Sequence, residues 1–300
     1  MKERVHERLG RIGLWTFFFG SGPAAAAREL AVEAEELGYE ALWYPEALGR
    51  EGLVLGSLLL GWTERVGVAS GILNIWGRDA VAAANGARTL EEAHPGRFVL
   101  GLGVSHQHVV TARGHRYERP FSEMQRYLDA LDEAPYLGPE IDETPPRLLA
   151  ALAPRMLGLA AERAAGSLTY FMPPEHTAVA RERMGADALL AVEQAVVLGE
   201  DATRARDVAR EFAGRYLAAE NYRRSLLRLG FTEADLDDGT DRVLDAVIVC
   251  GDEETIAARI REHFDAGADH VAVQPLPNTE PQLETLRRLA PALRELAPRS

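Results

Sequence analysis

Two side chains able to exchange protons, Glu46 and His106, each stand directly after a short apolar run. Glu46 follows Trp43-Tyr44-Pro45, and His106 follows the glycine-rich segment 101–105. An imidazole has an ordinary pKa of about 6.5 and a carboxyl one of about 4.3, so both can act as acid or base. A lone Glu is usually a solvated loop residue, but a position directly after a strand favours a role in a site. The two residues therefore predict general acid–base chemistry.

A metal site is the alternative chemistry for the segment His106-Gln107-His108. Residues two apart can present their rings on the same side of an extended segment, as metal ligands do. Metal-dependent hydrolases built on barrels generally need further ligands from other strands. The remaining internal histidines do not follow predicted strands: His94, His115, His176, His263 and His270. We therefore expect no bound metal and favour a single histidine, His106, that faces a cofactor or a substrate.

The segment Gly20-Ser21-Gly22-Pro23-Ala24-Ala25 matches the G-x-G-x-x-A pattern of dinucleotide-binding proteins, with Glu40 at a suitable distance downstream. The pattern is short, and the chain is rich in Gly and Ala. A turn followed by proline in the first turn of a helix explains the same residues. We therefore disfavour a dinucleotide site here.

Elements that alternate between strand and helix must position these residues. Strands are predicted near 12–16, 41–44, 66–72, 97–102, 147–152, 167–171, 189–198 and 270–275, and each is followed by a predicted helix. Eight such units are the number that closes a parallel barrel, with an open doubly wound sheet as the alternative. The sequence predicts one domain over 1–300, a (β/α)8 TIM barrel with an insertion at 104–120 and a helical insertion at about 199–250. The second insertion is expected to contain its own helices, with 202–229 a long charged helical stretch.

In a barrel of this kind the site lies where the strands end. Those positions combine aromatic rings, one carboxylate, two imidazoles and several small residues. They suit a broad, flat, partly apolar ligand better than a bare phosphosugar. The positions are Thr16 to Phe19, Pro45 and Glu46, Gly71 to Trp76, Gly103 to His108, Ala150 and Ala151, Phe171 and Met172, and Gln274 and Pro275.

Composition excludes several other classes of function. With 46 Asp and Glu against 33 Lys and Arg, the formal net charge is −13, which disfavours binding to nucleic acid or to an anionic membrane. No apolar leader or membrane-length run is present, so we expect a cytoplasmic protein. Lys2 is the sole lysine and is expected at a mobile terminus. Its position excludes Schiff-base, pyridoxal phosphate and Walker-type phosphate chemistry, each of which needs a placed lysine.

The predicted helix over 53–62 is apolar on nearly every side. One face would pack on the barrel, and the other needs a different partner. We expect that partner to be a second copy of the chain, which would make the protein a homodimer.

Several segments of the chain resemble those of the luciferase-like monooxygenase superfamily, in particular the branch that uses the 5-deazaflavin coenzyme F420. The similarity extends over nearly the whole chain. Its most specific stretches are 41–49, 68–79, 96–106, 154–157 and 266–274. The resemblance implies a (β/α)8 barrel, commonly dimeric, that holds the cofactor ring at the carboxyl ends of its strands. It also implies a non-prolyl cis peptide in a bulge at Ser70-Gly71-Ile72, which we place between Gly71 and Ile72.

Two positions depart from the pattern of the family. Deazaflavin-dependent sugar-phosphate dehydrogenases of this superfamily have a catalytic His where this chain has Glu46, and a catalytic Glu where it has His106. An imidazole and a carboxylate are thus retained with their places exchanged. Together with the lack of lysines, the exchange argues against a sugar-phosphate substrate.

The resemblance implies hydride transfer between F420 and an unidentified small organic substrate. His106 is then expected to be the acid or base, and Glu46 to orient it, contact the cofactor or act as partner acid. Phe17, Trp76 and Phe171 would wall the pocket, and Ala150 and Ala151, with Arg155, would take the cofactor phosphate. An FMN-dependent monooxygenase and a non-catalytic cofactor-binding protein are the alternatives. The expected cofactor contacts are Glu46, Ser70, Gly71, Ile72, Asn74, Val104, His106, Ala150 and Ala151.

Overall fold

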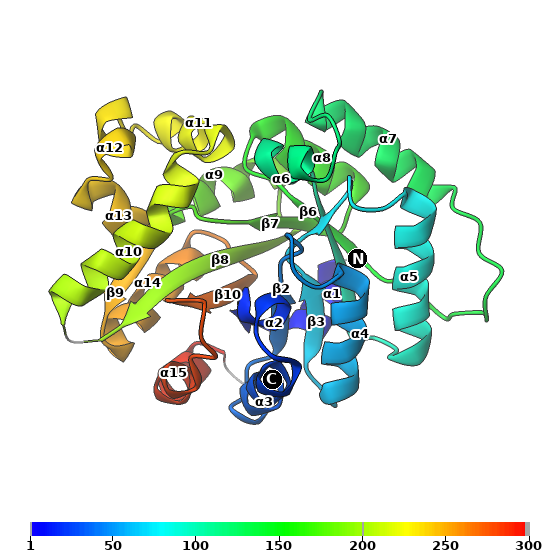
Figure 1. Ribbon diagram of the computed structural model, residues 1–300, viewed down its shortest axis with the longest axis horizontal. Coiled ribbons are helices and arrows are strands. Elements are labelled where there is room, and N and C mark those ends of the chain that lie inside the picture. Colours follow the sequence, from blue (N-terminus) through cyan, green and yellow to red (C-terminus); the bar gives the residue numbers. More distant parts are fainter. Residues whose placement is uncertain (1, 200, 298–300) are drawn as a thin grey trace.

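A computed structural model of the protein describes residues 2–199 and 201–297 and shows a closed barrel of parallel strands at its centre (Figure 1). β10 pairs with both β8 and β1, which closes the ring. The closure confirms the predicted (β/α)8 barrel and excludes the open sheet. In order around the ring, the strands are β1 (Ile12–Trp15), β2 (Ala41–Tyr44), β3 (Gly67–Ser70), β5 (Phe98–Gly103), β6 (Arg147–Ala150), β7 (Gly166–Thr169), β8 (Leu189–Leu198) and β10 (His270–Pro275).

Helices surround the barrel, as the alternating pattern predicts. Several begin at an acidic cap: Asp79 accepts a hydrogen bond from the Ala82 N–H at 2.8 Å, and Asp252 one from the Thr255 N–H at 2.8 Å. The outer helices are α3 (Ala24–Glu36), α4 (Gly52–Trp62), α5 (Ala80–Ala93), α7 (Pro120–Asp132), α8 (Pro154–Arg163), α9 (Pro174–Met184), α14 (Glu253–Asp265) and α15 (Leu283–Leu296). None of the helices within the described residues has the length and apolar character needed to cross a bilayer.

Short elements that the sequence pattern does not predict lie at both ends of the barrel. At the mouth these are α2 (Phe18–Ser21), β4 (Leu73–Asn74) and α6 (Gln107–Ala112). At the opposite end, α1 (Lys2–Leu9) buries Val5 and Leu9 against the barrel interior. The expectation of a mobile Lys2 is wrong, because its Nζ donates to the Ala186 carbonyl at 2.8 Å and pairs with Asp269 at 2.8 Å.

The second insertion differs from its prediction in two respects. The expected helical stretch over 202–229 is present but is interrupted at Ala218 and Ala219, which separate α10 (Ala202–Leu217) from α11 (Glu220–Arg228). After α12 (Glu233–Asp238) and α13 (Asp241–Val247), an additional strand, β9 (Ile248–Gly251), pairs with the far end of β8 outside the ring. In Figure 1 these helices lie beside the end of β8, at the upper left.

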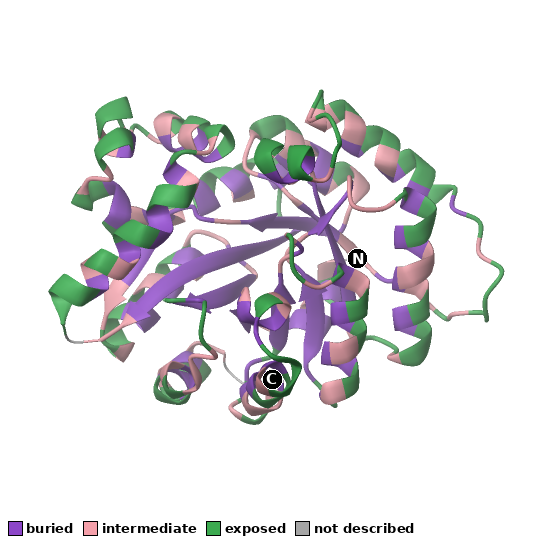
Figure 2. Ribbon diagram, viewed as in Figure 1, coloured by how far each residue is buried: buried purple, intermediate pink, exposed green. Residues whose placement is uncertain are grey.

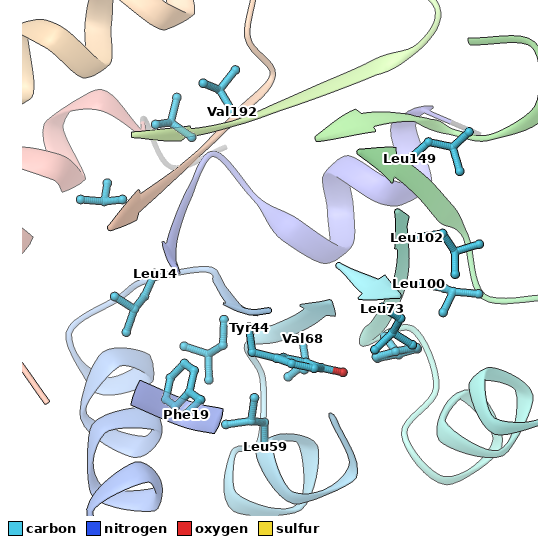
Figure 3. Packing of buried hydrophobic residues seen from close by; sticks show 14 of the residues in the cluster. Leu14, Phe19, Tyr44, Leu59, Val68, Leu73, Leu100, Leu102, Leu149 and Val192 are labelled. Atoms are coloured by element: carbon cyan, nitrogen blue, oxygen red, sulfur yellow. The ribbon is translucent and has the colours of Figure 1, made fainter. Parts of the chain in front are cut away.

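Three groups of buried side chains hold the molecule together, and the strands are buried on both faces (Figure 2). The largest lies between the barrel and its outer helices, where Leu14, Tyr44, Val68, Leu100 and Val192 point outward from successive strands (Figure 3). A second group fills the barrel interior with side chains that alternate along the strands with the outward-pointing ones. Among them are Trp15, Trp43, Val99, Leu148 and Ala191. The third joins the insertion to the mouth through Phe171, Phe212, Tyr222 and their neighbours.

Candidate active site

The predicted cofactor contacts on β3, β5 and β6 come together at one side of the barrel mouth. The peptide bond between Gly71 and Ile72 is cis, where the family resemblance places it. A Cβ at Gly103 would lie 2.5 Å from Ile72 Cγ1 and 3.3 Å from the Ala150 Cβ. Ile72 therefore lies directly over a glycine and beside Ala150. This arrangement requires the small residue at position 103, because a side chain there would displace Ile72.

The bulge also rests on the barrel interior. A Cβ at Gly71 would lie only 2.7 Å from Trp15 Nε1. The Gly71 N–H donates to the Tyr44 carbonyl at 2.7 Å, and Ser70 Oγ donates to the Gly101 carbonyl at 2.9 Å. The bulge is thus fixed to β2 on one side and to β5 on the other. Ile72, half-buried, forms a shelf at the mouth.

Glu46 is buried and fully engaged with its surroundings. Its Oε2 accepts from the Asn74 N–H at 2.8 Å and from Arg78 Nη1 at 3.0 Å, and Oε1 accepts from the Gly52 N–H at 3.3 Å and from Arg78 Nη2. Its own N–H donates to the Ile72 carbonyl at 3.1 Å. These contacts link the loop after β2 to the bulge, and they account for the burial of a charged carboxylate.

His106 lies after β5, at the start of α6. Its ring is 5.9 Å from that of His108 in a stacked arrangement and 5.5 Å from that of Tyr222 on α11. Burial lowers the pKa of His106, the neighbouring His108 lowers it further, and a hydrogen bond with Asn221 acts in the opposite direction. The imidazole is therefore neutral at neutral pH and able to accept a proton. In the described part of the chain, no hydrogen bond joins His106 to Glu46.

The remaining predicted contacts surround the shelf. Asn74 Oδ1 accepts from the Trp76 N–H at 3.0 Å, whereas its buried Nδ2 has no partner among the described residues. Trp76 Nε1 donates to the Val104 carbonyl at 3.0 Å, which joins the segments after β4 and β5.

Of the groups predicted to bind the cofactor phosphate near Ala150 and Ala151, one backbone N–H already has a partner in the protein. The Ala151 N–H donates to the Leu168 carbonyl at 3.2 Å and so belongs to the barrel ladder. The nearby group that faces solvent is Arg155 in the first turn of α8. Its guanidinium lies 4.2 Å from the centre of the Phe121 ring.

Sequence reasoning missed a layer of side chains beneath the mouth and a group of aromatic rings above it. Glu193, on the inward face of β8, is 1% exposed. A single carboxyl in the apolar run Leu-Leu-Ala-Val-Glu-Gln-Ala-Val-Val-Leu was the signal available for it. No comparable signal marked the insertion, which brings Tyr216 and Tyr222 against Phe171 at ring distances of 4.9 and 5.6 Å.

Across residues 2–199 and 201–297, no group of three or more His, Cys, Asp and Glu side chains could hold a metal ion.

Comparison with known proteins places this geometry in a family. The profile of the luciferase-like monooxygenase family matches residues 11–270. A protein of Mycobacterium tuberculosis named as a coenzyme F420-dependent oxidoreductase is 30% identical over 120 residues, which are 40% of this chain and 35% of that protein. The 5,10-methylenetetrahydromethanopterin reductase of Methanolobus tindarius is 24% identical over 315 residues, covering 90% of this chain and 96% of the reductase.

Solved structures share the fold at low sequence identity. An F420-dependent secondary alcohol dehydrogenase in complex with an F420–acetone adduct has a TM-score of 0.77 at 15% identity and covers 95% of this chain and 99% of its own. The oxygenating constituent of 3,6-diketocamphane monooxygenase from Pseudomonas putida, in complex with FMN, has a TM-score of 0.67 at 16% identity. The match covers 96% of this chain and 98% of the monooxygenase chain. With 260 residues matched by the family profile, from 11 to 270, the chain belongs to the luciferase-like monooxygenase family.

Proposed function

We propose that the protein is an oxidoreductase that binds the deazaflavin coenzyme F420 at the barrel mouth and acts on a small organic substrate. The observation that carries the proposal is the shelf at Gly71 and Ile72, which is hydrogen-bonded to β2 and β5 and kept clear by Gly103. A flat ring fits against such a shelf, and the unpartnered Asn74 Nδ2 beside it can donate to a ring carbonyl. When bound, F420 supplies hydride transfer, and the chain supplies position, exclusion of water and management of protons.

Around that ring we assign roles from the contacts described above. Ser70, Gly71, Ile72, Asn74, Val104 and Ala150 would hold it, and the first turn of α8 near Ala151, with Arg155, would take its phosphate. Glu46 would act as a positioning residue, because its carboxylate orders the bulge and neutralises Arg78.

His106 would be the acid–base residue. Its neutral imidazole can take a proton from a substrate hydroxyl, or return one to a substrate oxygen in the opposite direction. The ring of Tyr222 on α11 covers this side of the mouth and would keep water from the reacting atoms.

Replacing His106 with Ala tests this assignment. Turnover should fall by about 10²–10⁴ with little change in the Kd of the cofactor, because one proton-transfer group is removed from an otherwise intact site. The matched control is His108→Ala, the exposed neighbour, which should retain activity. A variant that loses F420 binding but keeps its turnover at saturation would reassign His106 to cofactor binding.

An FMN-dependent monooxygenase is the second candidate, because a monooxygenase structure in complex with FMN has the same barrel fold. Quenching of cofactor fluorescence on titration with protein separates the two. We expect tighter binding of F420, and preferential binding of FMN would overturn the first choice. Binding of either cofactor with no turnover across a broad substrate panel would favour a non-catalytic protein.

We also propose that the protein is a homodimer that pairs through α4. Val54 on this helix is 57% exposed, and Leu48 just before it is 69% exposed. Val54→Arg should convert a dimer to a monomer in light scattering coupled to gel filtration. Val179→Arg, at an exposed valine on α9, is the matched control and should leave the mass unchanged. A wild-type monomer at micromolar concentration would refute the dimer.

A further inference from the structure

The uppermost layer of the barrel interior contains polar side chains that the proposed chemistry does not use. Ala191 and Ala272 point into the barrel, so Glu193 and Gln274, two residues further along the same strands, point inward as well. Glu193 is 1% exposed and Gln274 is fully buried. Trp15 completes the layer from β1.

Glu193 is a carboxyl group without an ion pair in the described residues. Its Oε2 accepts from the Phe171 N–H at 2.9 Å, and its Oε1 has no partner there. The titratable groups that face it are Tyr170 after β7, Tyr216 on α10 and Tyr222 on α11. Burial raises the pKa of Glu193 to about 8, although the Phe171 N–H acts in the opposite direction. At neutral pH the group is therefore a carboxylic acid with an O–H to donate.

Gln274 presents a second donor without an acceptor. Its Oε1 accepts from the Tyr170 hydroxyl at 2.9 Å, and the same hydroxyl lies 2.9 Å from that of Tyr216. This bond fixes the orientation of the amide and leaves its buried Nε2 without a partner in the described chain. The Nε1 of Trp15, whose ring lies 5.0 Å from that of Tyr170, is also buried and unpartnered there.

Buried donors almost always have an acceptor, supplied by protein, water or ligand. Here the acid O–H of Glu193, the amide of Gln274 and the indole N–H of Trp15 all lie around Tyr170, and each lacks an acceptor. Two of these donors are neutral groups by nature, and the third is neutral while protonated. The layer is therefore suited to an uncharged acceptor oxygen, and it offers no cation for a phosphate or carboxylate.

We propose that Glu193 and Gln274 form a substrate subsite that donates hydrogen bonds to the oxygen of a neutral carbonyl compound or of the corresponding alcohol. The inference rests on the proposed function, since it places this oxygen beneath the mouth that holds the cofactor ring. Tyr216 and Tyr222 from the insertion cover the subsite, so the remainder of the substrate would be apolar and lie against their rings.

Binding of cyclohexanone, followed by saturation-transfer NMR on the full chain without cofactor, tests the subsite. Glu193→Leu should weaken binding by about tenfold or more, whereas Glu193→Gln, which keeps a donor, should bind within about threefold of wild type. In the wild type, binding should weaken by about tenfold as pH rises from about 7 to about 9, since the carboxylate has no O–H. The Glu193→Gln variant should bind equally well across that range.

Gln194→Leu is the matched control, because Gln194 neighbours Glu193 but hydrogen-bonds His263 on the outer side of the strand at 2.9 Å. It should bind cyclohexanone like the wild type, and circular dichroism checks that every variant is folded. Three results would overturn the inference. Cyclohexanone could bind equally well to the wild type and to Glu193→Leu, or it could fail to bind to the wild type. The third result is a Glu193→Gln variant whose binding depends on pH as that of the wild type does.

A separate measurement keeps the two proposals apart. If F420 fails to bind and the dependence on Glu193 holds, the cofactor assignment fails and the subsite stands. If F420 binds and cyclohexanone binding is indifferent to Glu193, the subsite alone fails.

Discussion

At the scale of single residues, the exchanged pair Glu46 and His106 differs most in what surrounds each side chain. Glu46 is held by Arg78 and by two backbone N–H groups, so its negative charge is stabilised where it lies. His106 has ring neighbours and one amide partner, and burial favours its neutral form. We therefore assign the proposed acid–base role to the histidine, whereas the carboxylate supports the structure of the bulge.

Replacing Glu46 with Ala should destabilise the protein by about 3–5 kcal/mol, because a buried ion pair loses one partner and the Asn74 N–H loses its acceptor. Urea unfolding followed by circular dichroism measures the free energy. The matched control is Glu220→Ala, which removes the exposed ion pair with Arg224 and should cost no more than about 0.5 kcal/mol. A loss below about 1 kcal/mol for Glu46→Ala would show that the carboxylate does not order the bulge.

At the scale of elements, α11 is the helix of the insertion that contacts His106. It carries Asn221 and Tyr222, which meet His106 from above. Because α10 ends at Leu217, α11 can change direction and bring these residues over the barrel. A single helix over 202–229 would have continued along the line of α10.

Asn221→Ala should lower the pKa of His106 further, because the hydrogen bond that favours the protonated ring is removed while burial remains. NMR titration of the histidine ring protons follows the change, and the acidic limb of kcat/KM should move to lower pH with it. Asn85→Ala, on α5, removes an amide that accepts from Arg88 and should leave the titration of His106 unchanged. An unchanged pKa in Asn221→Ala would remove α11 from the control of His106.

The sequence predicted the ring strands because each is a short buried run between turns, and β8 was matched at both ends. The Gly71–Ile72 bond was placed from a resemblance. The break at Ala218 and Ala219 was not predictable, since neither Gly nor Pro marks it and alanine favours helix. The ion pair of Glu46 with Arg78 was also missed, because it joins residues that lie 32 positions apart and only the bulge brings them together.

At the scale of the whole molecule, a histidine at the base of the barrel links stability to pH. His270 Nε2 accepts from Trp43 Nε1 at 2.9 Å, and its Nδ1 lies 3.0 Å from the Gly10 carbonyl, to which it donates. Both partners are satisfied by the neutral ring, and a proton on Nε2 would face another donor. Burial lowers the pKa of His270 to about 4.

In the unfolded chain this histidine has a pKa of about 6.5. Between about pH 4 and pH 6.5 the unfolded chain therefore binds a proton at His270 that the folded chain does not bind. The contribution of His270 is fully present above about pH 6.5 and is lost as pH falls toward about 4, at up to about 1.4 kcal/mol per pH unit. Urea unfolding at a series of pH values measures this slope. His270→Gln should reduce the slope by that amount, and the exposed His115→Gln should not. An identical slope in wild type and His270→Gln would contradict the assignment.

The pairing of β1 with β10 has a consequence for synthesis of the chain. Ile12 lies opposite Val271, so β1 is synthesised long before β10, its second neighbour in the ring. During translation the nascent sheet has an open edge at β1, and such edges associate with other chains. Ring closure is therefore a late event, and a nascent chain stalled before β10 would be a substrate for chaperones.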